Sequence, residues 1–470
     1  MSSDIETEIC IIGAGPAGAA LATRLAQFGR DVCLVERQAV PRPHIGESLP
    51  ASVWPILNLL GVAPEVEAAG FLCATGSVLH WGGQFERRGP TAGQPGLLVD
   101  RGQFDSILLD AAQREGAQVL TQTRAYRPDH SADGWCIPLR SEQGPRQLRA
   151  NVLIDAAGRQ AGFGRRYRQC APPLLALYAY WQAPPGFGAQ ARVEAGEAHW
   201  VWAALLPNGL VNAMVFVDPA RCTGLTPADR RDLYLNLLAQ SPLLSPCLEQ
   251  RRMGPVRQAD ATSQIEMTPP TADFLRVGEA SFCVDPLSSQ GVQLAMGQAL
   301  QAAAVVNTVL TRPDHAAQAL DFYADRQQER VQVHAQLAAE YYARQLQISS
   351  DPFWQNRSQA PEWLQTGAIE LETAPVPTQA KLILSTKAHL HEAGVQTETL
   401  IEPGQVLSHP NLPRPVANLD GIALPPLIAS CQNPTGADDL RGRFRKTLPP
   451  DLAERVVHWL WTYRILVVAD

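Results

Sequence analysis

The chain has 470 residues, 46% of them hydrophobic and 18% charged, a composition typical of a globular protein with two or three packed domains. Its formal net charge of −7 gives no overall basic field that would point to a nucleic-acid partner, so we expect none. The nine cysteines occur singly, without a CxxC pair or a His/Cys cluster, so we expect reduced thiols, no metal site and a cytoplasmic location.

The first segment of the chain predicts a β-α-β unit. Residues 5–12 form an apolar strand, residues 17–28 a helix that Gly29 ends, and residues 31–35 a second strand leading into Glu36. The turn between strand and helix reads Gly13-Ala14-Gly15-Pro16-Ala17-Gly18. In a dinucleotide-binding turn, the three glycines permit the tight turn, the approach of a pyrophosphate and close helix packing. The helix N-terminus then faces the phosphates and Glu36 the ribose hydroxyls, a pattern that fits NAD and FAD equally.

The middle of the chain predicts more of the same sheet and then a second sheet. A helix follows Pro50, another covers residues 104–115, and strands are expected at 117–120 and 151–154. Between residues 174 and 217, short β-rich runs are separated by proline and glycine turns. This texture is typical of an antiparallel sheet.

Two later segments separate FAD from NAD. The strand at 151–154 leads into Asp155 and Gly158, and the segment at 276–292 contains Glu279 and Asp285. This second segment ends with Ser289, Gln290, Gly291 and Val292, where a helix predicted for 291–310 begins, and a further helix is predicted for 317–346. A carboxylate at a strand end suits a ribityl hydroxyl, and a helix N-terminus favours the negative charge of a reduced flavin. An NAD dehydrogenase does not need this third element, so the sequence favours FAD.

The predicted fold class is α/β, with a Rossmann-like FAD-binding domain (a βαβ unit in a three-layer parallel sheet), an antiparallel-sheet substrate domain and a mainly helical C-terminal extension. The FAD-binding domain is assigned to residues 1–80, 97–170 and 255–350, the substrate domain to 81–96 and 171–254, and the extension to 351–470. The stretch at 456–468 is apolar but shorter than the roughly 18 residues of a membrane span. With no signal pattern at the N-terminus, we predict no transmembrane segment and a buried final helix or strand.

These motifs together resemble those of FAD monooxygenases, flavin-dependent halogenases and geranylgeranyl-reductase-like proteins. The matching pieces are Gly13–Gly18, Glu36, the run Pro41–Pro50 (PRPHIGESLP), Val99-Asp100-Arg101 with Phe104-Asp105, Asp155–Gly158 and Gly278–Gly291. They stand in family order over residues 1–310, about two thirds of the chain. One departure is Glu279, where the family usually has Asp.

Motifs and resemblance together assign the cofactor-binding residues. The resemblance implies that Arg101 contacts the FAD ribose or phosphates, that the 46–48 turn lies close to the cofactor, and that Asp285 and the 289–292 turn contact the flavin. The predicted set is Gly13, Gly15, Pro16, Ala17, Gly18, Glu36, Arg37, Gly46, Glu47, Ser48, Arg101, Asp155, Gly158, Glu279, Asp285, Ser289, Gln290, Gly291 and Val292.

One position argues against halogenation. Halogenases of this group use a lysine to capture hypohalous acid, and Ala74 stands at the matching place in the stretch 73–82; the first lysine of the chain is Lys381. The segment from His199 to Pro207 resembles the tryptophan element of halogenases, with Trp200 and Trp202 on one side of a strand. Such a wall keeps the chemistry dry, although two core tryptophans that merely pack a sheet explain it equally well.

The remaining reactions are oxygen insertion and simple reduction. The resemblance implies hydroxylation of an electron-rich ring through a C4a-hydroperoxyflavin, with His80, His44 and Trp202 as candidate catalytic residues; either histidine also fits a structural role. Electrons would come from NADH or NADPH. Because the sequence shows no second complete dinucleotide fold, NAD(P)H would dock transiently or a separate flavin reductase would deliver the electrons. The narrower resemblance is to flavoprotein monooxygenases that hydroxylate a protein tryptophan during tryptophylquinone biogenesis, as in quinohemoprotein amine dehydrogenase maturation.

That resemblance implies a protein or peptide client, which the C-terminal extension would bind. Two alternatives stay open. One is an FAD-dependent small-molecule hydroxylase or reductase. The other, of a different class, is a non-catalytic flavin-binding escort, which the intact cofactor motifs disfavour.

Overall fold

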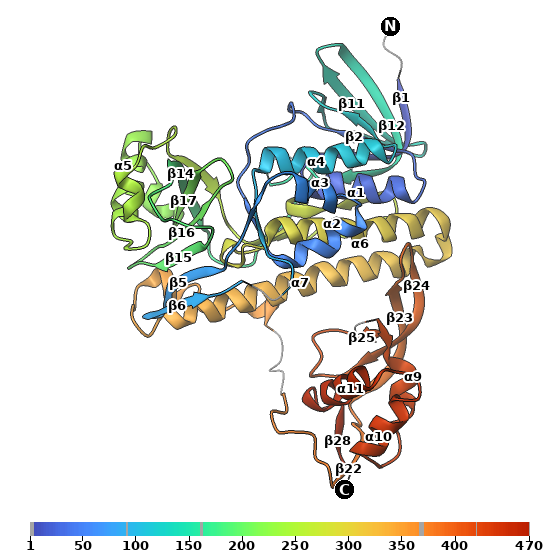
Figure 1. Ribbon diagram of the computed structural model, residues 1–470. Coiled ribbons are helices and arrows are strands. Elements are labelled where there is room, and N and C mark those ends of the chain that lie inside the picture. Colours follow the sequence, from blue (N-terminus) through green and yellow to red (C-terminus); the bar gives the residue numbers. More distant parts are fainter. Residues whose placement is uncertain (1–3, 91–92, 160–162, 366–370, 420, 470) are drawn as a thin grey trace. The chain divides into compact units, whose positions relative to one another are not determined.

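The computed structural model describes residues 4–90, 93–159, 163–365, 371–419 and 421–469. The chain divides into two compact units, one formed by residues 1–307 and 330–364 and the other by residues 308–329 and 365–470. The predicted α/β fold class is confirmed: parallel and antiparallel sheets alternate with helices along the chain (Figure 1).

The first unit contains a parallel sheet that begins with the predicted β-α-β unit. Its strands are β1 (Ile5–Ile12), β2 (Val32–Val35), β8 (Gln118–Leu120), β12 (Gly144–Asp155) and β20 (Phe274–Arg276), in the order β8-β2-β1-β12-β20. The first half of β12 pairs instead with the antiparallel strand β11 (Gly134–Ser141), and β9 (Arg124–Ala125) and β10 (Asp129–Ser131) extend that side. The C-terminal ends of β1, β2 and β12 therefore meet at one edge, where a parallel sheet binds its ligand.

Two helices pack side by side against this sheet, α1 (Pro16–Gln27) and α4 (Arg101–Arg114) (Figure 1). The first turn of α4 is capped by Asp100, whose carboxylate accepts a 2.9 Å hydrogen bond from the backbone N–H of Gln103. By contrast, α1 begins at Pro16 without any side-chain cap. Its first N–H groups therefore remain available at the sheet edge.

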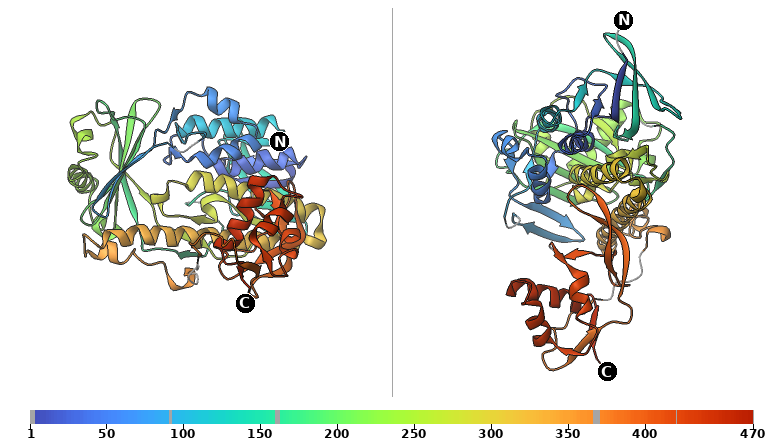
Figure 2. Two further views of the ribbon diagram at one scale, coloured as in Figure 1. Left: turned by 60° about the horizontal axis from the view of Figure 1, so that its bottom comes forward. Right: turned by 90° about the vertical axis from the view of Figure 1, so that its right-hand side faces the viewer.

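The first unit also contains a second, seven-stranded sheet. Its order is β18-β14-β17-β16-β15-β5-β6, with β5 (Ser77–Trp81), β6 (Gln84–Arg88), β14 (Leu175–Gln182), β15 (Ala191–Ala195), β16 (Trp200–Leu205), β17 (Leu210–Val217) and β18 (Arg257–Asp260). Helix α5 (Pro227–Ala239) covers one face, seen edge-on in the left view of Figure 2. The other face, which we call the inner face, packs against residues of the cofactor motifs such as Ile45 and Leu287.

Shorter elements and two long helices complete the first unit. They are β3 (Ser48–Leu49), α2 (Trp54–Leu59), α3 (Ala63–Ala68), β4 (Leu72–Cys73), β7 (Leu97–Leu98), β13 (Tyr167–Gln169), β19 (Gln264–Glu266), β21 (Phe282–Cys283), α8 (Pro352–Gln355), and parts of α6 (Gly291–Thr311) and α7 (Ala316–Gln345). Within the described residues, α6 alone is long and apolar enough to cross a membrane, and 61% of its most apolar window is buried. A core helix passes the same test.

The second unit mixes strands and helices around its own core. Its elements are β22 (Lys381–Leu384), β23 (His389–Gln396), β24 (Ile401–Ser408), β25 (Asn418–Leu419), β26 (Ile422–Ala423), α9 (Leu424–Ala429), β27 (Thr435–Gly436), α10 (Ala437–Phe444), α11 (Pro450–Thr462) and β28 (Leu466–Val468). The C-terminal extension is thus mixed rather than mainly helical, because β23 and β24 pair along eight residues. The predicted buried end is confirmed: Val456, Val457 and Leu460 of α11 are fully buried.

Candidate functional site

The first glycine turn has room for glycine alone at two positions. Gly13 adopts φ +108°, and a Cβ there would lie 2.5 Å from the carbonyl oxygen of Ala156 at the end of β12. A Cβ on Gly18 would lie only 1.9 Å from the carbonyl oxygen of Gly13. The turn is thereby pressed against two strand ends, which brings the start of α1 to the edge of the sheet.

Glu36 anchors the end of β2 beside this turn. Its buried carboxylate accepts 2.9 Å hydrogen bonds from the backbone N–H groups of Ala14 and Gln38, and Arg42 Nη2 lies 3.3 Å from its Oε2. The neighbouring Arg37 is exposed. Two carboxylate oxygens offer about four lone pairs, so Glu36 keeps the capacity to accept from a ribose.

The space in front of α1 fits a diphosphate. The nearest atom to a Cβ built on Gly15 is Arg42 Nη2 at 3.9 Å, so this part of the turn is open. Arg42 Nε is buried and has no hydrogen-bond partner among the residues that the structure describes. The uncapped start of α1 and the open Gly15 leave room for the diphosphate that the dinucleotide motif predicts, and its binding there stays a prediction.

A second helix start lies beside the 44–48 loop. A Cβ on Gly46, where φ is +98°, would lie 2.9 Å from Arg101 Nη1 and 3.4 Å from Val292 Cγ2, at the start of α6. The buried Arg101 donates to both carboxylate oxygens of Asp105, at 2.9 and 3.1 Å, and to the Ile45 carbonyl at 2.6 Å. Arg101, the first residue of α4, therefore ties this loop to α4, and its predicted contact with FAD stays a prediction.

Asp285 precedes the same helix start, separated from it by Ser289 in the left-handed region at φ +51°. The Asp285 carboxylate accepts 3.0 Å hydrogen bonds from the Leu287 N–H and from the Tyr342 hydroxyl of α7. Its complete burial raises the pKa of this carboxyl above its usual value. Sequence reasoning missed Tyr342, because nothing in a helix pattern marks which tyrosine reaches a strand end 57 residues earlier.

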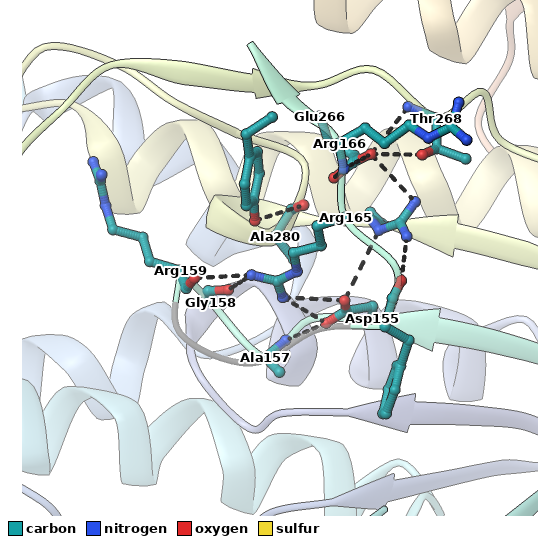
Figure 3. Close-up of polar contacts among 12 residues, drawn as sticks. Asp155, Ala157, Gly158, Arg159, Arg165, Arg166, Glu266, Thr268 and Ala280 are labelled. Atoms are coloured by element: carbon teal, nitrogen blue, oxygen red, sulfur yellow. Dashed lines mark hydrogen bonds and ion pairs between the residues drawn. The ribbon is translucent and has the colours of Figure 1, made fainter. Parts of the chain in front are cut away.

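Asp155 ends β12 in a network of arginines, shown in Figure 3. Its carboxylate accepts from Arg165 Nη2 at 3.1 and 3.2 Å and from the Ala157 N–H at 3.0 Å, while Arg165 Nη1 donates to the Gly158 carbonyl at 2.7 Å. The predicted Glu279 is half-exposed and lies 3.5 Å from Arg159 Nε. These contacts fix the chain that follows β12, and no sequence pattern marked Arg165 as the partner of Asp155.

The inner face of the seven-stranded sheet carries an aromatic wall, by which we mean Trp200, Trp202 and Phe216. All three are buried, and Trp200 stacks on Phe216 with ring centroids 3.8 Å apart. Ala74, the position of the halogenase lysine, packs against the same cluster. The wall therefore faces the cofactor motifs with rings only and presents no amine at that position.

The candidate catalytic residues are not brought together. Trp202 is in register with Val193 of β15, whereas His80 is in register with Glu194, the next residue, so the two side chains point to opposite faces. His80 Nδ1 lies 2.8 Å from Glu194, which also accepts from the Ser241 hydroxyl on the α5 side. His44 is exposed, and its Nδ1 lies 2.8 Å from the Ile45 carbonyl. In the described ranges, no three metal-binding side chains cluster.

This arrangement defines an FAD-binding oxidoreductase, and comparisons with known proteins agree. The FAD binding domain family matches residues 6–167. A tryptophan 2-halogenase of Chondromyces crocatus is 32% identical over 360 residues, 72% of this chain and 68% of that protein. A flavin-dependent halogenase of Armillaria mellea is 27% identical over 63% of this chain and 64% of its own length. The chain belongs to the superfamily of FAD-dependent monooxygenases and flavin-dependent halogenases.

Solved structures extend the likeness to the whole chain. The peptidyl tryptophan dihydroxylase QhpG, essential for tryptophylquinone cofactor biogenesis, has a TM-score of 0.74 and 27% identity over 97% of this chain and 99% of that one. The flavin-dependent halogenase CmlS has a TM-score of 0.84 and 20% identity over 100% of this chain and 96% of that one. The latter similarity is one of fold.

Proposed function

We propose that this protein is a monooxygenase that hydroxylates an aromatic substrate, a tryptophan within a protein or peptide, during the formation of a quinone cofactor. The observation that carries the proposal is an aromatic wall without an amine at residue 74. The similarity to the dihydroxylase over nearly the full length of both chains supports a peptide substrate.

Each part of the site has a role in this reaction. The start of α1 with Arg42 would hold the diphosphate, Glu36 would hold the adenosine ribose, and the start of α6 would favour negative charge on a reduced flavin. Bound and reduced FAD activates dioxygen and supplies an electrophilic oxygen atom. The aromatic wall, which packs in one cluster with Ile45 and Leu287, excludes water beside the cofactor motifs and so protects the reaction from wasteful release of peroxide.

Three further parts belong to the same proposal. Electrons come from NADH or NADPH, directly or through a flavin reductase, and the reaction takes place in the cytoplasm. The second unit lies outside every cofactor motif and binds the client. On this proposal, a tryptophan-containing client peptide is turned over and free tryptophan is not.

The reaction is tested with labelled dioxygen. The enzyme, FAD, NAD(P)H with a flavin reductase, and a client peptide are incubated under ¹⁸O₂, and the peptide is sequenced by mass spectrometry. We expect one or two labelled oxygen atoms on a single tryptophan, because the oxygen comes from O₂ and not from water. Labelled product from free indoles alone, or none at all, would reject the peptide substrate.

The competing reaction is halogenation, which the 32% identity to a tryptophan 2-halogenase favours. We expect no brominated or chlorinated peptide when either halide is added in excess, because Ala74 cannot capture hypohalous acid as a lysine does. A halogenase assayed in parallel controls for halide and oxygen supply. The isotope doublet of bromine on the product would overturn this expectation.

A further inference from the structure

A carboxyl group is buried between the cofactor loop and the inner face of the sheet. Glu47 is 2% exposed, and its Oε1 accepts a 2.7 Å hydrogen bond from the Tyr180 hydroxyl. Asn212 Nδ2 donates to both carboxylate oxygens at 3.2 Å. Tyr180 and Asn212 face each other in register on β14 and β17, so two neighbouring strands hold one carboxyl group.

The same residue is tied to the loop next to the start of α6. Glu47 Oε2 accepts a 2.9 Å hydrogen bond from the Gly46 N–H, and Gly46 lies against Arg101 and Val292. The Glu47 carbonyl accepts from the Val99 N–H at 2.8 Å. The Glu47 side chain therefore connects the loop at Gly46 with β14 and β17 of the seven-stranded sheet.

The charges around Glu47 do not neutralise it fully. Arg101 is the nearby cation, but its guanidinium is already paired with Asp105. Burial raises the pKa of the Glu47 carboxyl, against the lowering effect of Tyr180, Asn212 and Arg101. Burial also raises the pKa of the Tyr180 phenol, which stays a neutral donor.

We propose that Glu47 is a positioning residue that fixes the 44–48 loop to strands β14 and β17 and so sets the distance between the flavin pocket and the aromatic wall. It acts on the cofactor through the loop backbone rather than by binding it with its carboxylate. Two strands and a loop that are far apart in sequence are joined at this one group, and a hydrogen bond to a charged or desolvated partner is costly to lose. The role of Glu47 rests on the proposed function only in that the aromatic wall is taken as the substrate side.

The test measures FAD affinity without any substrate. Tyr180→Phe removes one hydrogen bond from Glu47, on a strand outside the cofactor motifs, and we expect the Kd for FAD to rise about tenfold. In the Glu47→Ala background the same change should have no further effect, because the connection is already lost. Tyr178→Phe is the matched control, since that ring lies on the same strand 6.2 Å from Tyr180, and it should leave the Kd unchanged.

Two results would overturn the proposal. One is an unchanged FAD affinity in folded Tyr180→Phe, and the other is an equal loss in both backgrounds, which would mean that Tyr180 acts without Glu47. Since no substrate is present, these outcomes do not depend on whether hydroxylation is observed.

A pH series gives a second readout. The folded-state pKa of Glu47 is raised, so the folded protein holds the proton more tightly than the unfolded chain. The free energy of unfolding of the wild type, relative to Glu47→Gln, should therefore be greatest in acid and fall as pH rises through the raised pKa. If the free energy of unfolding of the wild type relative to Glu47→Gln rises with pH, or does not change, Glu47 is not a buried carboxyl with a raised pKa.

Discussion

Gly18→Ala is expected to yield a protein that purifies without FAD and unfolds more easily by upwards of about 3 kcal/mol. Its new Cβ would meet the Gly13 carbonyl oxygen at 1.9 Å and the Ala156 Cβ at 3.2 Å. The first of these belongs to backbone held between two strands, so the clash is relieved only if the turn opens. The measurements are the flavin-to-protein absorbance ratio after purification and the midpoint of thermal unfolding.

Two further glycines serve as controls for this result. Gly15→Val should fold normally, since no atom lies closer than 3.9 Å to its Cβ, yet it should lose FAD because the side chain fills the diphosphate space. Gly442→Ala, in α10 with nothing within 4 Å of the new Cβ, should leave the flavin-to-protein ratio unchanged and should not lower the unfolding midpoint, because alanine favours the helix. A Gly18→Ala protein that binds stoichiometric FAD would show that the turn is not built as described.

The second large effect is expected for Asp155→Ala, which should lower the free energy of unfolding by about 3–5 kcal/mol. The change leaves the Arg165 guanidinium, only 9% exposed, without its carboxylate, and removes the acceptor of the Ala157 N–H. Breaking a buried pair from one side is costly because the remaining charge stays desolvated. Chemical denaturation monitored by tryptophan fluorescence gives the difference.

The matched control is an exposed ion pair in the same unit. Glu65 and Arg114 contact each other at 2.8 Å, but their side chains are 41% and 47% exposed. Glu65→Ala should therefore cost no more than about 1 kcal/mol. Equal losses in Glu65→Ala and Asp155→Ala would mean that burial of the Asp155 network contributes nothing.

Much of the cofactor side was predictable from the sequence, because its signals are local. The apolar run at residues 5–12 and the glycine spacing at 13–18 can be recognised without knowing any tertiary contact. The strand and the start of the helix both appear as predicted. The carboxylates at strand ends were likewise visible, since Asp155 follows an apolar run. What these carboxylates contact was not visible, because Arg165 and Tyr342 reach them from other elements.

The substrate side was harder to predict, because the face of the sheet to which a side chain points depends on the register of its strand. His80 lies near the cofactor motifs in sequence, yet one residue of register places it on the face covered by α5. In the second unit, β23 has mostly exposed, polar residues and no apolar alternation, so no period-2 pattern marked it as a strand. Its pairing with β24 is visible only in the folded chain.

The second unit is built from two separated pieces of chain, residues 308–329 and 365–470. During synthesis the first piece must therefore wait for the second before the unit can fold. The segment at 308–329 is synthesised early, but its partners come late: Thr308 accepts from the Ile401 N–H at 2.7 Å, and Gly394 packs on Phe322. The first unit has all its residues once Leu364 has emerged, and domains generally fold as units during synthesis. A chain that ended between Leu364 and Gly394 would contain the whole first unit but would leave residues 308–329 without their partners. We expect chaperones and proteases to recognise this uncovered surface.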